Sequence, residues 1–351
     1  MPPLVSICMP VYNGQRFLEE AIESVLAQTY QHFELLIADD ASTDDSVQIA
    51  QRYAQRDSRI MLWRNPTNKG LFANYNECFA RASGPLIKPF AQDDVWHEEI
   101  VQRLAAVFTE HPSVSLAAVK RLWLTDSGEE TPLDFEVSDT GVMNGSLCAK
   151  TCLLKRANLV GEPSAVMFPR QLAAGGFDTM YYHLGDLDLW LRLLQYGDYF
   201  YVHDPLCFFR RHEGGATTRN IKQLLFALDQ LKLADQHATL IANDEAGIDE
   251  LKINTTTDVA RFVSQLFESG EITVDDVTAN SPDSRQSKQF QKLAFYALLA
   301  VTQMERKWQP QVEAKDAHIR GLEQSLDAIH ASKRWQLAGM FAPLAHERKV
   351  K

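Results

Sequence analysis

Cysteine, positive charge and long apolar runs are all scarce in this chain. Its 351 residues hold five scattered cysteines, which fit neither a disulfide framework nor a Cys/His zinc site, so we expect reduced thiols. A net charge of −11 excludes a general nucleic-acid binder. No apolar run reaches the roughly 18 residues of a membrane-spanning helix. Met1–Pro3 leads directly into an apolar run, without a basic secretory leader. These features predict a cytoplasmic protein.

Two apolar patterns alternate through the first third of the chain. Short runs typical of buried strands are each followed by apolar residues at helical spacing. The four strand-like runs are Val5–Val11, Glu34–Ala38, Arg59–Trp63 and Leu86–Ala91. Repeated strand–helix units place parallel strands side by side through right-handed crossovers. We therefore predict an α/β fold with a doubly wound, mostly parallel sheet flanked by helices.

Polar clusters follow these runs at the points where the predicted strands end. The clusters are Tyr12-Asn13-Gly14, Asp39-Asp40, Asn65–Gly70 and Asp93-Asp94. Ligands of open parallel sheets bind beyond the carboxyl ends of the strands. Buried carboxylates are costly unless a cation, a hydrogen-bonding ligand or water meets them. The clusters therefore predict one shared site that takes both a metal and a polar group.

Each motif also has an ordinary structural explanation. Acids near a helix start are favoured by the helix dipole, and Ser42 with Asp45 makes an acceptable capping box. Asp93-Asp94 alone fits a solvated loop. Asp186 opens an amphipathic helix, either as a first-turn acid or as a general base. His212 lies in a basic, glycine-containing segment, as a surface residue or as a contact to metal or phosphate.

Taken together, these motifs resemble the family 2 glycosyltransferases of the GT-A fold, over about residues 3–217 and in the family's order. The matching stretches are Val5–Gly14, Ala38–Asp44, Asn68–Gly70 with Asn74, Gln92–Trp96, Gly161–Met167 and Gly185–Arg192. The resemblance implies an inverting enzyme that moves a sugar from a nucleotide-diphosphate donor to a hydroxyl of a glycan or lipid-linked acceptor. Family members with similar tails build bacterial surface polysaccharides (O-antigen, capsule or exopolysaccharide) at the inner face of the plasma membrane, which implies a peripheral location.

The resemblance also implies roles at the donor side of the site. Pro10 and Tyr12 would line the nucleobase pocket. Asp40 would bind the edge of the base, and Asp93 would contact the ribose. The donor implied is a UDP-, dTDP- or GDP-sugar.

Further roles concern the metal and the acceptor. Asp94 would bind a divalent metal, Mn²⁺ or Mg²⁺, on the diphosphate, with His212 as a further metal or phosphate contact. Asp186 would deprotonate the acceptor hydroxyl, and the segment Cys207–Thr218 would close over the donor. Two positions depart from the family pattern. Ala91 stands where many members carry an aspartate, and Gly185 stands where a glutamate commonly precedes the base.

The resemblance implies that the chain has three parts. Residues 1–112 would form the nucleotide-sugar-binding half and residues 113–219 the acceptor-binding half of one GT-A domain. Residues 220–351 would form a helical region with a short coiled coil and an amphipathic tail. Two other functions stay open. One is a degenerate transferase domain that serves as a scaffold. The other is a sugar-1-phosphate nucleotidylyltransferase, which needs a more glycine-rich loop than the one around Gly14.

The C-terminal pattern yields a testable prediction. Apolar residues between Val312 and Ile329 follow a heptad rhythm, and the apolar stretch Trp335–Leu344 has basic flanks. Deleting residues 320–351 should therefore reduce oligomer size or binding to anionic vesicles, measured by light scattering and vesicle flotation. Donor binding should persist. If the truncated protein loses nucleotide binding, the domain boundary is misplaced.

Overall fold

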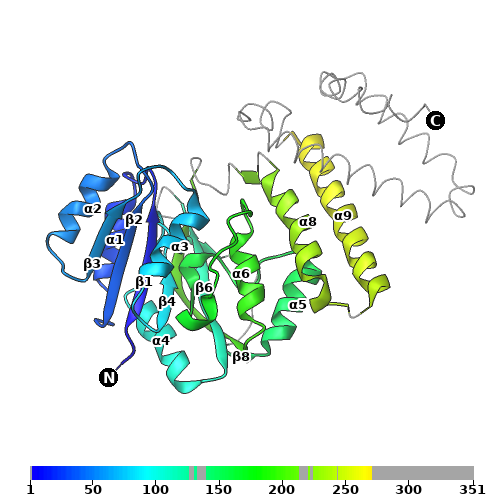
Figure 1. Ribbon diagram of the computed structural model, residues 1–351, viewed down its shortest axis with the longest axis horizontal. Helices are drawn as coiled ribbons and strands as arrows, with labels where there is room; N and C mark the ends of the chain where they lie inside the picture. Colours follow the sequence, from blue (N-terminus) through cyan, green and yellow to red (C-terminus); the bar gives the residue numbers. More distant parts are fainter. Residues whose placement is uncertain are drawn as a thin grey trace, which may run out of the picture. The chain divides into compact units, whose positions relative to one another are not determined.

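The computed structural model describes residues 2–125, 130–132, 140–212, 220–221, 224–242 and 244–270 (Figure 1). The chain divides into two compact units. The first consists of Met1–Ile221 and Leu228–Lys252, and the second consists of Lys222–Ala227 and Ile253–Lys351. The predicted heptad segment and the apolar tail lie outside the described residues. None of the described helices is long and apolar enough to cross a membrane. All of the described strands belong to the first unit.

Four parallel strands form one half of the sheet, in the order β3-β2-β1-β4. They are β1 (Val5–Val11), β2 (Phe33–Asp39), β3 (Ile60–Arg64) and β4 (Leu86–Pro89). Each strand was predicted, with ends that differ by no more than two residues. The α/β class with a mostly parallel sheet is confirmed, because buried parallel strands are continuous apolar runs that a sequence displays directly.

The other half of the sheet is mixed. The antiparallel strand β9 (Val166–Pro169) lies between β4 and β6 (Val114–Leu124). Beyond β6 comes the long parallel strand β10 (Asp198–Arg210), which also pairs with the antiparallel β5 (Val95–Trp96). Two further antiparallel strands, off this path, are β7 (Glu130–Pro132) and β8 (Gly141–Met143). This half departs from repeated strand–helix units, because β9 pairs antiparallel with both of its neighbours.

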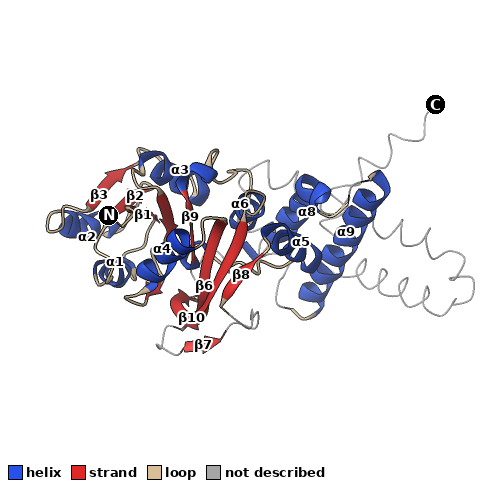
Figure 2. Ribbon diagram, turned by 90° about the horizontal axis from the view of Figure 1, so that it is seen from below, coloured by secondary structure: helices blue, strands red, loops and turns tan. Residues whose placement is uncertain are grey.

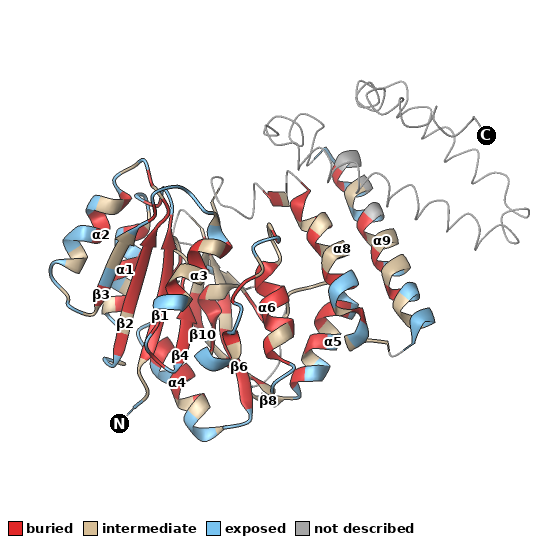
Figure 3. Ribbon diagram, viewed as in Figure 1, coloured by how far each residue is buried: buried red, intermediate tan, exposed pale blue. Residues whose placement is uncertain are grey.

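Helices cover both faces of the sheet (Figure 2). The helices on the sheet are α1 (Leu18–Leu26), α2 (Ser46–Ala54), α3 (Leu71–Arg81), α4 (Ile100–Glu110), α5 (Gly145–Lys155) and α6 (Gly185–Leu193). The chain continues with α8 (Leu225–His237) and α9 (Glu245–Glu268). Three short 3₁₀ turns are η1 (Pro163–Ala165), η2 (Arg170–Ala173) and η3 (Ala238–Leu240). Since α1, α2 and α4 contribute to one buried cluster and α3, α5 and α6 to the other, the central strands are buried on both sides (Figure 3).

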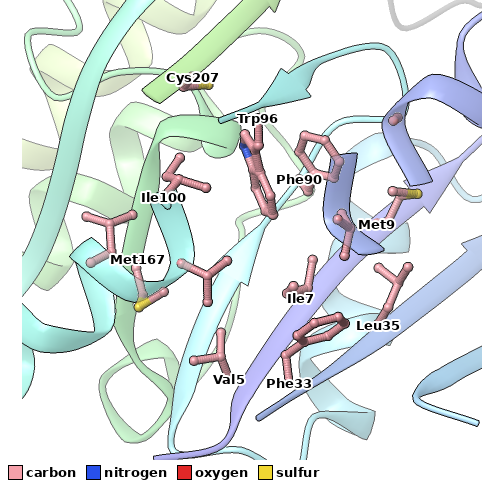
Figure 4. Close-up of a cluster of buried hydrophobic side chains, with 14 of the residues drawn as sticks. Val5, Ile7, Met9, Phe33, Leu35, Phe90, Trp96, Ile100, Met167 and Cys207 are labelled. Carbon is pink, nitrogen blue, oxygen red and sulfur yellow. The ribbon is translucent and has the colours of Figure 1, made fainter. Parts of the chain in front are cut away.

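Alternate residues of β1 serve these two cores. Ile7 packs with Leu35 and Trp96 on one face (Figure 4), whereas Cys8 packs with Leu36 on the other. This alternation follows from the two-residue period of a strand. A sheet covered on both faces leaves its strand ends as the place where polar groups can meet a ligand.

A lysine without any solvent exposure, Lys88, lies in β4. Its Nζ donates to Ser164 O at 2.5 Å and to Pro89 O at 3.3 Å, and it lies 4.0 Å from the centre of the Trp96 ring. Burial lowers the pKa of Lys88 from 10.5 to about 7, because the charged form loses its hydration. The lysine therefore joins β4 to the turn η1 with a group that loses its charge readily.

Lys88→Met tests this buried charge. Between about pH 7 and 10.5 the unfolded chain keeps the Lys88 proton and the folded chain releases it. The free energy of unfolding of the wild type should therefore rise with pH relative to the variant, by at most about 1.4 kcal/mol per pH unit. Chemical denaturation at pH 7, 8 and 9 measures the difference. Parallel pH profiles for the two proteins would show that Lys88 keeps an ordinary pKa.

Candidate functional site

Side chains join the ends of β1, β2 and β4 to one another. Gln92 Oε1 accepts a hydrogen bond from Tyr12 N at 2.8 Å, and Gln92 Nε2 donates to Tyr12 O at 3.0 Å. Asn13, at φ 50°, accepts from Thr43 N at 2.8 Å and donates its own N–H to Ser42 Oγ at 3.0 Å. These bonds bring three of the predicted polar clusters to one edge of the sheet.

The Asp40 carboxylate organises a fourth cluster, the loop after β3. Its Oδ1 accepts from Asn65 Nδ2 at 2.8 Å, and its two oxygens share Lys69 N at 3.0 and 2.9 Å. Its Oδ2 also accepts from Gly70 N at 2.8 Å. A carboxylate offers about four lone-pair sites, so these three donors leave about one for a further donor. Asp40 thus has a clear structural role, with limited capacity to bind the edge of a base.

The other acids after β2 stabilise the chain locally. Asp39 Oδ2 accepts from Ser42 N at 3.1 Å. Asp44 accepts from Ser46 N at 3.0 Å, at the start of α2. The predicted capping box of Ser42 and Asp45 is therefore wrong: Asp44 is the acid that supplies the acceptor, and α2 begins only at Ser46.

The second acid pair is held by the end of β10. Arg210 N donates to Asp94 Oδ1 at 2.9 Å, and Arg210 Nε donates to Asp93 O at 2.8 Å. His212 Nε2 lies 3.1 Å from Asp93 Oδ2. Arg210 is only 8% exposed, and its guanidinium lies 4.5 Å from the centre of the Phe17 ring. The structure thus brings together Asp93, Asp94 and His212, as predicted.

Arg210 is a residue whose role sequence reasoning missed. We expected a flexible segment from Cys207 to Thr218, but β10 continues through Arg210. The aromatic-rich run before Arg210 was the available signal, since such runs are typical of strands. The Arg211 guanidinium lies 4.8 Å from the centre of the Trp123 ring. Residues 213–219 lie outside the described part of the chain.

One oxygen of Asp94 bears on metal binding. Asp94 is 1% exposed, and its Oδ2 has no hydrogen-bond partner among the described residues. Burial and the neighbouring charge of Asp93 raise the pKa of Asp94 well above its usual range. The described residues contain no cluster of three or more His, Cys, Asp or Glu side chains that could hold a metal. Asp94 therefore offers one buried carboxylate oxygen that could meet a cation, whereas the described residues hold no preassembled set of metal ligands.

Asp186 lies in the first turn of α6 and is 8% exposed. Its Oδ2 accepts from Asn158 Nδ2 at 2.9 Å, and its Oδ1 accepts from Leu187 N at 2.7 Å. Burial raises the pKa of Asp186 to about 7, and the charge of Glu162 acts in the same direction. A carboxyl group with this pKa can accept a proton near neutral pH, as a general base must.

A buried ion pair near Asp186 was also missed. Arg121 Nη1 donates to Glu162 Oε2 at 2.7 Å, and the Arg121 side chain is 7% exposed. Gly161 makes this contact possible, because a Cβ there would lie 2.4 Å from Arg121 Nη1. The stretch Gly161–Met167 was noted for its family pattern, but its charge partner on β6 is distant in the sequence.

The remaining predicted positions differ in exposure. Pro10 is buried within β1, whereas Tyr12 is 45% exposed just beyond the strand. Ala91 N donates to Ser164 Oγ at 2.9 Å, at the position where many family members carry an aspartate. At Gly185 a Cβ would lie 2.6 Å from the Phe72 ring, so a glutamate there would displace the ring.

An α/β sheet with paired acids beyond its strand ends and a further carboxylate on a later helix defines a GT-A glycosyltransferase. Solved structures share this fold. S. aureus TarS 1–349 in complex with UDP-GlcNAc has a TM-score of 0.52 and 16% identity, covering 73% of this chain and 80% of the TarS 1–349 chain. Mannosyltransferase PcManGT from Pyrobaculum calidifontis, in complex with GDP-Man and Mn²⁺, has a TM-score of 0.52 and 17% identity, covering 88% of each chain.

Sequence comparison identifies the family. The model of glycosyl transferase family 2 matches residues 6–137. EpsE of Bacillus subtilis (strain 168), named as a glycosyltransferase, is 31% identical over 198 residues, which are 56% of this chain and 68% of EpsE. TuaG of the same strain, named as a teichuronic acid biosynthesis glycosyltransferase, is 35% identical over 101 residues, 29% of this chain and 40% of TuaG. The chain belongs to glycosyl transferase family 2.

The raised pKa of Asp186 predicts the pH dependence of glycosyl transfer. Below about pH 7 the carboxyl group holds a proton and cannot accept another, so if Asp186 is the base, kcat/KM should fall by up to about tenfold per pH unit. Steady-state rates between pH 5 and 8.5 measure this acidic limb. An acidic limb of kcat/KM near pH 4 would show that the group that must be ionised for glycosyl transfer has the pKa of an ordinary carboxylic acid.

Proposed function

We propose that the protein transfers a sugar, with inversion, from a nucleotide-diphosphate donor to a hydroxyl of a glycan or lipid-linked acceptor. The observation that carries this proposal is the buried Asp94 oxygen, which has no hydrogen-bond partner among the described residues and lies at the edge where Tyr12, Asp40 and Asp93 also lie. The name of TuaG supports bacterial surface polysaccharide synthesis as the context. The donors bound by TarS and PcManGT support a UDP- or GDP-sugar, and dTDP-sugars belong to the same chemical class.

The donor would bind along the ends of β1, β2 and β4. The exposed Tyr12 ring offers a face on which a base can stack. Pro10 and Asp40 would complete the base pocket, and Asp93 would accept a hydrogen bond from the ribose. Residues 1–112 would thus serve the donor and residues 113–219 the acceptor. Nearly all of these contacts come from strand ends that the protein already holds together.

Asp94 would hold a divalent metal, Mn²⁺ or Mg²⁺, and His212 would contact the metal or the diphosphate. When bound, such an ion neutralises the negative charge that develops on the departing diphosphate. The Mn²⁺ bound by PcManGT supports this assignment. Because Ala91 offers no carboxylate, the protein would contribute few ligands and the donor would contribute most of them.

Asp186 would take the proton from the attacking hydroxyl. Its hydrogen bond from Asn158 fixes the orientation of the carboxylate, and its pKa of about 7 leaves a useful ionised fraction near neutral pH. The C-terminal region would bring the enzyme to the inner face of the plasma membrane or join two copies.

A panel of nucleotide sugars tests the proposal. One donor should bind and turn over, and Mn²⁺ or Mg²⁺ should strengthen its binding. Asp94→Asn should lower transfer by at least about 100-fold, because a neutral amide stabilises a cation less well than a carboxylate does. Asp204→Asn is the matched control, since Asp204 pairs with Arg103 at the surface and its side chain is 50% exposed.

Two results would contradict the proposal. If no donor binds or turns over and Asp94→Asn behaves as the wild type does, the protein is better described as a scaffold. If the protein instead joins a sugar 1-phosphate to a nucleoside triphosphate and releases pyrophosphate, it is a nucleotidylyltransferase.

A further inference from the structure

The segment from Asn158 to Ser164 bridges the two acidic groups of the site. At one end, Asn158 Nδ2 donates to Asp186 Oδ2 at 2.9 Å and to Gly161 O at 3.0 Å. At the other end, Ser164 Oγ accepts from Ala91 N at 2.9 Å, and Ser164 O accepts from Lys88 Nζ and Trp96 Nε1. Glu162 therefore lies between the base and the strand that leads to Asp94.

The Glu162 carboxylate is held in place with one oxygen available. Its Oε2 pairs with the buried Arg121, while no described residue donates to its Oε1. The side chain is 27% exposed, so the carboxylate can reach a ligand. Gly161, at φ 124°, leaves the space that the Arg121 guanidinium occupies. An arginine fixed on one oxygen leaves the other free to accept hydrogen bonds.

The charge of Glu162 acts on both neighbouring acids. It raises the pKa of Asp94 and that of Asp186, as a carboxylate placed between them must. Arg121, on β6, acts on Asp186 in the opposite direction. The site lacks acids at Ala91 and Gly185, and Glu162 supplies a carboxylate from a different element.

We propose that Glu162 is a specificity-determining residue, whose Oε1 accepts a hydrogen bond from the acceptor hydroxyl next to the one that Asp186 deprotonates. The reacting end of the acceptor is then a neutral sugar with vicinal hydroxyls. This inference rests on the proposed function. A polyprenyl phosphate does not fit as the attacking group, because its phosphate carries no neighbouring hydroxyl to donate to Glu162 Oε1, and Arg121 is already paired.

Acceptor kinetics test this assignment once a donor is known. A panel of 4-nitrophenyl glycosides and a polyprenyl phosphate serve as acceptors. At least one glycoside should be glycosylated, and the polyprenyl phosphate should not. Glu162→Gln should raise the KM of that glycoside by about 10- to 100-fold, the range typical of a lost hydrogen bond to a charged group. The donor KM should change less than about threefold.

A pH profile of Glu162→Gln and two further variants separate a loss of acceptor binding from a structural effect. Glu162→Gln should move the acidic limb of kcat/KM to lower pH, because removing its charge lowers the pKa of Asp186. Glu162→Asp keeps the charge and retracts the oxygens, so it should raise the acceptor KM with little shift of the limb. Glu99→Gln is the matched control, since Glu99 pairs with Arg103 at the surface and is 48% exposed.

The outcomes are distinct. An unchanged acceptor KM in Glu162→Gln, glycosylation of the polyprenyl phosphate, or transfer to none of the glycosides would overturn the assignment of Glu162 while donor hydrolysis still proceeds. Absence of donor binding and hydrolysis in the wild type would instead overturn the proposed function itself.

Discussion

The burial of the Asp94 carboxylate is the constraint on which the arrangement of the site depends. A buried negative charge needs hydrogen-bond donors and nearby positive charge. Arg210 N supplies a donor from β10, and the Ser164 hydroxyl lowers the pKa of Asp94 from η1. Lys88, itself buried in β4, is close enough for Asp94 to raise its pKa. Asp94 thus interacts with groups on three elements, and its second oxygen has no hydrogen-bond partner in the part of the chain that the structure describes.

The first half of the fold was predictable because its information is local. Each run from Val5–Val11 to Leu86–Ala91 is apolar throughout, and helical spacing follows each one, so strand order and polarity follow from chain order and handedness. The second half was not predictable in this way. β9 is short, and it pairs with β4 and β6 only because the tertiary fold places it there. No periodicity in Val166–Pro169 reveals those partners.

The residues of the site also fall into two groups, those that the sequence reveals and those that only the fold reveals. The acids at positions 40, 93, 94 and 186 stand out in the sequence because they break apolar patterns at the ends of elements. The residues that contact these acids and shift their pKa values do not stand out in the sequence. Arg210 is 116 residues from Asp94, and Arg121 is 41 residues from Glu162. A sequence shows which groups are charged, whereas the pKa of each group depends on burial and on partners that only the folded chain brings near.

The position of β9 has a consequence for synthesis of the protein. Since β9 separates β4 from β6, a nascent chain that ends before Val166 exposes the backbone donors and acceptors of β4 along one edge. Such an edge favours pairing with other chains. The sheet gains its last long strand only when Asp198–Arg210 has left the ribosome. The strands of residues 1–112 therefore form a sheet with an open edge at β4 until β9 is added, and an open edge exposes an incomplete chain to pairing with other chains.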